Sequence, residues 1–176
     1  QMNWVVDQSL RSKGLGGTQI RDMNMDTTFS NLMNHYEFGG ANSKGVYFDE
    51  ENRRHILSLR SIFGEAAGTL ADAGKLDQAK QLIDKVEAGI NTENLPYAMA
   101  SRYNGHNQTA LIYLEGCFKA GKKELAEKVA AEIRKDLEQQ ARYYSYIRDN
   151  KPDFWGYYER SEAPINERLL LVLSDI

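Results

Sequence analysis

The chain has 176 residues, of which 41% are apolar and 27% are charged, a composition typical of a folded domain and not of a disordered segment. Its 22 basic residues are interspersed with 25 acidic ones, and a formal charge of −3 gives no reason to expect nucleic-acid binding. The longest apolar run, 169–173, is far shorter than the roughly 20 residues that span a bilayer. The single cysteine excludes an intramolecular disulfide and a cysteine-based metal site. We therefore expect one domain with an irregular arm, no transmembrane segment and no nucleic-acid partner.

Residues 1–48 predict an irregular arm, a short helix and a loop. The Ser- and Gly-rich stretch 12–18 favours irregular chain over any regular element. Asp26 or Thr27 can cap a short amphipathic helix, and Gly39-Gly40 is expected to end it. This segment precedes a second region, 49–176, in which the apolar pattern is helical throughout.

An internal repeat organises that second region, because residues 70–79 return in similar form as residues 117–126. Each copy predicts a helix, a tight turn at Gly74 or Gly121, and a second helix. A small residue, Ala79 or Ala126, is expected where the two helices cross. A single helical hairpin cannot bury its apolar face alone, so repeated hairpins stack on one another. The sequence therefore predicts an all-α fold with two stacked units, about 50–91 and 96–148.

The limits of the later helices follow from capping and proline signals. Asp49 is a good N-cap for the first long helix, and Pro96 fits the first turn of the third. The third helix is expected to reach about Ala120 with Phe118 on its buried face. A fourth helix should run from about Lys123 to Arg148. An aromatic loop containing a proline is expected next, followed by a capping helix at about 164–175 that closes the stack.

The hairpin around Gly74 resembles the tetratricopeptide repeat. The positions where that family has an aromatic, a small, a large, an Ala, a large and a small residue are occupied by Phe63, Ala67, Leu70, Ala79, Ile83 and Val86. The closing proline of the family is missing from both units, and residues 103–106 interrupt the opening helix of the second. The resemblance implies a short stack of helical hairpins that serves as an interaction scaffold.

A second resemblance covers about residues 28–148. It is carried by the segments 29–40, 45–54 and 59–63 and by the two Ala-Gly-Lys hairpins. These resemble the C-terminal region of a family of large polytopic membrane proteins from Bacteroidetes, formerly of unknown function. The membrane part of that family resembles lipid-linked-sugar glycosyltransferases of the glycosyltransferase-C type, related to protein O-mannosyltransferases. The resemblance implies that this chain is part of a longer membrane protein, on the periplasmic face of the inner membrane, with the membrane domain as its attached partner.

Two groups of residues are candidates for binding a ligand. In stacked hairpins the first helix of a unit usually lines the concave side, and the second unit carries a polar and aromatic set there. The other group is an aromatic cluster within residues 143–158, although packing of the last helix would also explain most of it. Aromatic faces and planar donors stack on sugar rings or anchor a partner protein. The first set is Tyr97, Arg102, Tyr103, Asn104, His106 and Asn107, and the second is represented by Tyr143, Trp155 and Tyr157.

Catalytic chemistry has little support in the sequence. The three histidines His35, His55 and His106 share no short ligand spacing, and no serine lies in a nucleophile-elbow motif. We therefore assign no catalytic residue, metal or cofactor. The leading hypothesis is a non-catalytic helical-repeat interaction domain that binds protein or glycan. The alternative is a purely structural or oligomerisation appendage of the membrane protein. A third hypothesis, a small metal-dependent enzyme, requires acids and histidines to converge on one pocket.

Overall fold

The structure, a computed structural model, describes residues 24–174, and the predictions for the N-terminal arm up to residue 23 lie outside that range. Within 24–174 the chain forms seven α-helices, one short 3-10 turn and no strand. This confirms the predicted all-α fold. None of the helices described here is both long and apolar enough to span a bilayer.

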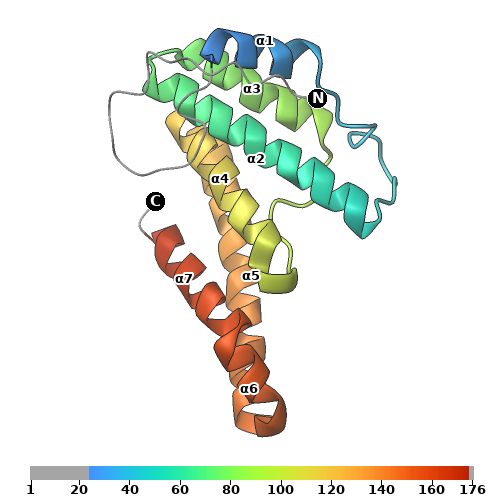
Figure 1. Ribbon diagram of the computed structural model, residues 1–176, viewed down its shortest axis with the longest axis vertical. Coiled ribbons are helices and arrows are strands. Elements are labelled where there is room, and N and C mark those ends of the chain that lie inside the picture. Colours follow the sequence, from blue (N-terminus) through green and yellow to red (C-terminus); the bar gives the residue numbers. More distant parts are fainter. Residues whose placement is uncertain (1–23, 175–176) are drawn as a thin grey trace.

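The first hairpin consists of α2 (Glu50–Asp72) and α3 (Leu76–Gly89). As expected, α2 begins at Asp49, whose carboxylate accepts a hydrogen bond from the backbone N–H of Asn52 at 2.8 Å. The short helix α1 (Met25–Asn34) packs against both helices of this hairpin and runs alongside α3 (Figure 1).

The predicted limits of α1 are wrong at both ends. Its N-cap is Asn24, whose side-chain oxygen accepts from the Thr27 N–H at 3.0 Å. Its C-terminus comes before Gly39 because Lys85 on α3 donates to the carbonyls of Leu32 and Met33 at 2.9 and 2.7 Å. A cation bonded to the last free carbonyls is a favourable way to end a helix.

The second hairpin consists of α4 (Gly105–Lys119) and α5 (Lys123–Asn150), and α2 packs between α3 and α4. The two hairpin turns have the same geometry. Gly74 and Gly121 have φ of +78° and +76°, and the N–H of the following lysine donates to the carbonyl of Leu70 or Cys117 at 2.8 or 2.9 Å. This is the Schellman motif, which requires a left-handed residue. The predicted turns are therefore confirmed.

The helices α2 and α4 approach each other closely at two glycines. Ala79 and Ala126 are buried, as expected of small residues in a hairpin. The tightest contact is between Gly64 and Gly116, where a methyl group on Gly116 would fall on the Gly64 carbonyl. A methyl group on Gly64 would lie 2.6 Å from the Cα atom of Tyr113. The absence of side chains at this crossing lets the two backbones touch.

The third long helix begins at Gly105 and not at Pro96, which corrects the prediction. Residues 96–101 are irregular and lead into the turn η3 (Arg102–Asn104). The cause lies in α2, where the buried guanidinium of Arg60 donates hydrogen bonds to the carbonyls of Leu95 and Pro96 at 2.7 and 2.9 Å. Those carbonyls are therefore turned away from any helix of their own segment.

The end of the chain is also more helical than predicted. The aromatic segment expected as a loop forms α6 (Pro152–Arg160), with Pro152 in the first turn. The predicted capping helix is α7 (Glu162–Ser174), which returns along α5 and contacts α4 (Figure 1). Phe118 is 52% exposed, so the prediction that it lies on the buried face of its helix is wrong.

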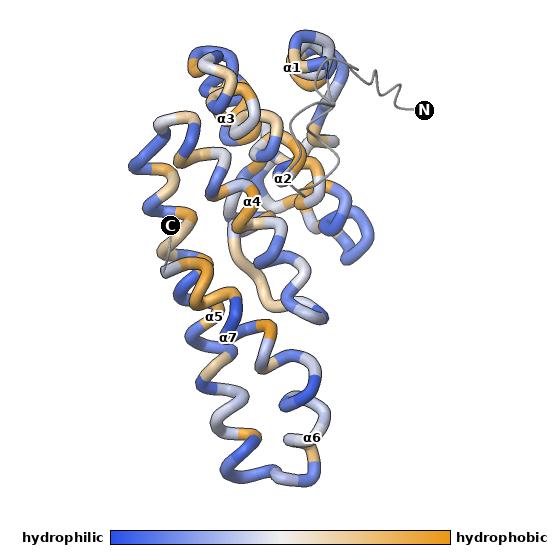
Figure 2. The backbone as a smooth tube through the Cα atoms, turned by 60° about the vertical axis from the view of Figure 1, so that its left-hand side comes forward, coloured by the Kyte–Doolittle hydropathy of each residue, from blue (hydrophilic) through white to orange (hydrophobic). Residues whose placement is uncertain are grey.

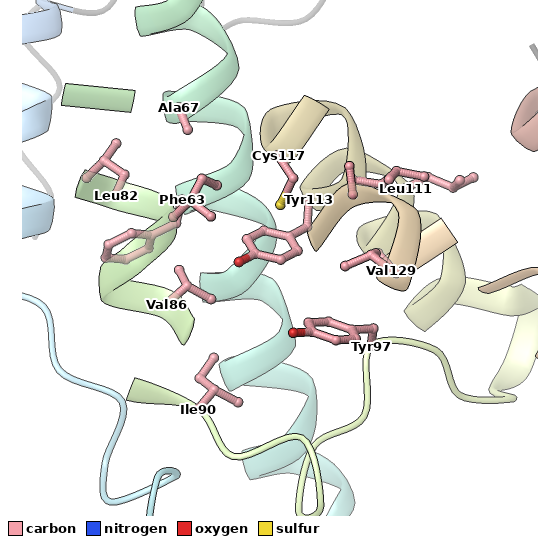
Figure 3. Close-up of a cluster of buried hydrophobic side chains, with 14 of the residues drawn as sticks. Phe63, Ala67, Leu82, Val86, Ile90, Tyr97, Leu111, Tyr113, Cys117 and Val129 are labelled. Atoms are coloured by element: carbon pink, nitrogen blue, oxygen red, sulfur yellow. The ribbon is translucent and has the colours of Figure 1, made fainter. Parts of the chain in front are cut away.

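The core lies where the two hairpins meet. Figure 3 shows its side chains coming from α2, α3, α4 and α5, with Phe63, Leu82, Val86 and Val129 among them. Figure 2 shows apolar residues concentrated there, whereas the far end of α5 and most of α6 are polar or intermediate. The two repeated units thus build most of the core, and the far end of α5 forms a separate, more polar arm with α6.

Candidate functional site

A pocket of about 600 Å³ lies at the junction of that arm with the second hairpin. It is bounded by the segment before α4, by α5 and α6, and by the start of α7. It brings Arg102 together with Tyr143 and Tyr157, so members of the two predicted sets share one site. The lining residues are Ala100, Ser101, Arg102, Asp136, Gln139, Gln140, Tyr143, Tyr144, Tyr157, Tyr158 and Glu162.

Four tyrosines form the apolar part of the pocket. The ring of Tyr158 meets those of Tyr143 and Tyr157 edge to face, at 89° and 88°, with centroids 5.8 and 5.2 Å apart. Tyr144 packs against both Tyr143 and Tyr158. Such edge-to-face contacts fix ring orientations. Tyr143 and Tyr157 remain 48% and 54% exposed, so this rigid cluster offers two open rings to a ligand.

A network of side-chain amides packs against the pocket and includes its lining residues Asp136 and Gln140. The side-chain amides of Asn107 and Gln140 both donate to Asp136 Oδ2, each at 2.7 Å, and both donate to Asn104 Oδ1, each at 2.9 Å. Asn166 on α7 donates to the Leu137 carbonyl at 3.1 Å. The network ties α4, α5 and α7 together and fixes the carboxylate of Asp136, since hydrogen-bonded buried amides rigidify their surroundings.

A strained turn at Tyr103 and Asn104 lies next to the pocket residue Arg102. Tyr103 and Asn104 have φ of +54° and +53°, the left-handed region that non-glycine residues rarely adopt. Glu162, which is 7% exposed, accepts a hydrogen bond from the Tyr103 N–H at 3.1 Å and holds this turn in place. The Arg102 guanidinium lies over the Tyr103 ring, 4.9 Å from its centroid, and donates to its hydroxyl at 3.2 Å. The turn therefore places Arg102 at the rim.

The pocket environment changes the pKa of the Tyr144 hydroxyl. Burial, with the negative charges of Glu162 and Asp136 nearby, raises the pKa of Tyr144 to about 12. The hydroxyl therefore stays protonated at neutral pH and donates to Gln140 Oε1 at 3.2 Å.

Tyr97 belongs to the core and not to the pocket. It is 2% exposed, and its hydroxyl donates to Glu87 Oε2 at 2.6 Å while that of Tyr113 donates to Glu87 Oε1 at 2.8 Å. The Arg60 guanidinium lies 5.0 Å from the centroid of the Tyr97 ring. Figure 3 shows the two tyrosine hydroxyls on the same side, toward α3. Tyr97 also precedes α4, so the prediction that it lies on that helix is wrong.

The other predicted site residues have structural contacts. Asn104 and Asn107 are fully buried in the amide network. His106 is 8% exposed, with Nε2 3.2 Å from Glu50 Oε1. Trp155 is half-buried on α6 and does not line the pocket. Of the first predicted set, Arg102 alone lines the pocket, and Tyr103 stands beside it.

The sequence interpretation missed Asp136, Gln140 and Glu162. The first two could have been found, because residues four apart share a helix face and Asp136, Gln140 and Tyr144 follow that spacing on one helix. Glu162 carries no local signal, since it reaches the pocket only after α6 has reversed the chain.

No group of three or more His, Cys, Asp and Glu residues within 24–174 is arranged to hold a metal ion. Comparison of the chain with protein-family models, with curated proteins and with solved structures gives no match. The residues of the pocket and the sequence resemblances are therefore the basis for assigning a function.

Proposed function

We propose that this chain is a non-catalytic, tetratricopeptide-like interaction domain that binds a protein or glycan ligand in the tyrosine-walled pocket. The observation that carries the proposal is the convergence of Arg102, Tyr143 and Tyr157, from distant parts of the sequence, on one pocket of about 600 Å³. Ligand sites ordinarily combine apolar walls with a few convergent polar groups. The amide network and the strained turn hold those groups in place before any ligand arrives.

The resemblance of residues 28–148 supports a place for this domain within a longer membrane protein. In that setting the domain lies on the periplasmic face of the inner membrane, beside an attached membrane domain of the glycosyltransferase type. A binding domain there would hold an acceptor protein or a glycan close to the transferase. The chain itself needs no catalytic residue for that role.

Arrays of glycans and peptides, probed with the fluorescently labelled full chain, test the proposal. Tyr143→Ala and Tyr157→Ala remove rings that are about half exposed, so both variants should fold. We expect each to lose most of the signal of the ligands that bind the wild type. Tyr146→Ala is the matched control, because Tyr146 is 56% exposed on α5 outside the pocket. Signals that do not change in the two pocket variants would refute the proposal.

A structural or oligomerisation role is the second candidate. It is favoured by Phe154 and Tyr146, which are 64% and 56% exposed and lie outside the pocket lining. Light scattering on the purified chain addresses it directly. A stable dimer that dissociates in Phe154→Ser, with array binding unchanged, would support assembly as a separate role of this arm.

A further inference from the structure

Among the residues 24–174, no cation pairs with either carboxylate of the pocket, Asp136 or Glu162. Asp136 uses Oδ2 and Glu162 uses Oε1 for hydrogen bonds inside the protein, while Oδ1 and Oε2 take none from the residues that the structure describes. Neither side chain forms an ion pair within 24–174. Glu162 is nevertheless only 7% exposed. Neither free oxygen is fully buried, so both are accessible in the pocket and available to a cationic ligand.

Arg102 does not fill this role. Its guanidinium is held over the ring of Tyr103 and bonded to that hydroxyl. It forms no ion pair with Asp136 or Glu162, although all three line the pocket.

The tyrosine walls suit the same kind of ligand. The face of an aromatic ring attracts a cation, and aromatic clusters are a common device for binding ammonium groups. The exposed rings of Tyr143 and Tyr157 also offer apolar surface to a hydrocarbon stem. A ligand that is apolar along its length and cationic at its tip matches walls of rings around two carboxylates. A neutral sugar, with hydroxyl groups on every side, matches them less well.

We propose that the pocket binds a lysine side chain of a protein partner. The ammonium group lies against the free oxygens of Asp136 and Glu162, and the four methylenes lie along Tyr143 and Tyr157. This inference rests on the proposed function, because it uses the same pocket, and it selects a protein ligand over a glycan.

NMR titration of the isotope-labelled full chain tests the proposal with two matched pairs of probes. The first pair is the blocked tripeptide Gly-Lys-Gly and its acetyl-lysine counterpart, which differ in charge. The second pair is glucosamine and N-acetylglucosamine. We expect the lysine peptide to shift resonances of the pocket residues and to bind about tenfold more tightly than the acetylated peptide, as a desolvated cation–π contact allows. Added salt should weaken binding of the lysine peptide and leave binding of the acetylated peptide unchanged.

Two variants locate the effect. Glu162→Gln keeps an acceptor for the Tyr103 N–H but removes the charge, and it should abolish the preference for the lysine peptide. Glu167→Gln, an exposed site on α7 outside the pocket, is the matched control. Tyr157→Leu keeps apolar surface without the ring, so it should weaken binding of the charged peptide only. This variant tests the proposal even if Glu162→Gln fails to fold.

Equal binding of the two peptides, or no shift of the pocket residues by either, would overturn the lysine assignment. Binding of glucosamine in preference to N-acetylglucosamine, without binding of the lysine peptide, would overturn the protein source and assign the cation to an amino sugar. The proposed function is judged separately, because pocket-dependent signals on the arrays would survive either result.

Discussion

The contact between Gly64 and Gly116 makes a quantitative prediction about stability. In Gly116→Ala the new methyl group meets the Gly64 carbonyl and Cα, which belong to the backbone of α2 and cannot rotate away. The helices must separate, and overpacking of a tight core costs about 1–3 kcal/mol. Exchanging Gly for Ala in a helix returns about 1 kcal/mol. We place the cost near the upper end of that range, so the net loss is about 2 kcal/mol in the free energy of unfolding.

Urea denaturation followed by circular dichroism measures this loss. The control is Gly156→Ala in α6, where the nearest atom to the new methyl group would be the Arg160 guanidinium at 3.8 Å, an ordinary contact. The control should gain up to about 1 kcal/mol from helix propensity. The dependence on urea concentration should be similar in both, because the surface exposed on unfolding is unchanged. If Gly116→Ala is as stable as the wild type, the close α2–α4 crossing is wrong.

Three further predictions concern the core and the strained turn. Glu87→Ala leaves the Tyr97 and Tyr113 hydroxyls without their acceptor and should cost about 2 kcal/mol, less when combined with Tyr113→Phe, in a denaturant double-mutant cycle. Burial raises the pKa of Cys117 to about 12, so the thiol stabilises the fold below its unfolded pKa of about 8.5, and that contribution is lost as the pH rises through 12. Cys117→Ala should make the free energy of unfolding fall less steeply over this range, and an unchanged slope would contradict the assignment. Tyr103→Gly should stabilise the chain by about 1 kcal/mol in thermal melts through relief of the left-handed strain, while a lower melting temperature would show that the ring contributes more than the strain costs.

The features of the fold that could be predicted from the sequence are those with local causes. Gly74 and Gly121 each end a helix through a left-handed residue, and the repeated pattern around them fixes the order of the helices. The late start of α4 has a distant cause, since Arg60 binds the carbonyls of Leu95 and Pro96 from another helix. A proline that fits a first helical turn could not reveal this competition.

The pocket was less predictable than the helices for a related reason. The aromatic cluster and Arg102 were visible as separate candidates in the sequence, but nothing local joins them. The reversal of the chain through α6 brings Tyr157 and Glu162 back to α5, and the segment expected as a loop is the element that does so. Four members of the other predicted set are instead buried, because polar groups in a short stack can complete the core when each has a hydrogen-bond partner. They are Tyr97, Asn104, His106 and Asn107.

The division between repeat and extension separates stability from binding. The two units supply the glycine crossing, the Glu87 cluster and most of the apolar core, whereas Tyr143 and Tyr157 belong to the arm that the far end of α5 forms with α6. Exposed side chains outside the core usually contribute within about 0.5 kcal/mol. Substitutions at the two open rings should therefore leave the free energy of unfolding almost unchanged while they remove binding, and Gly116→Ala should do the reverse where enough folded protein remains. A ligand site placed on an extension can change its specificity without weakening the scaffold that holds it.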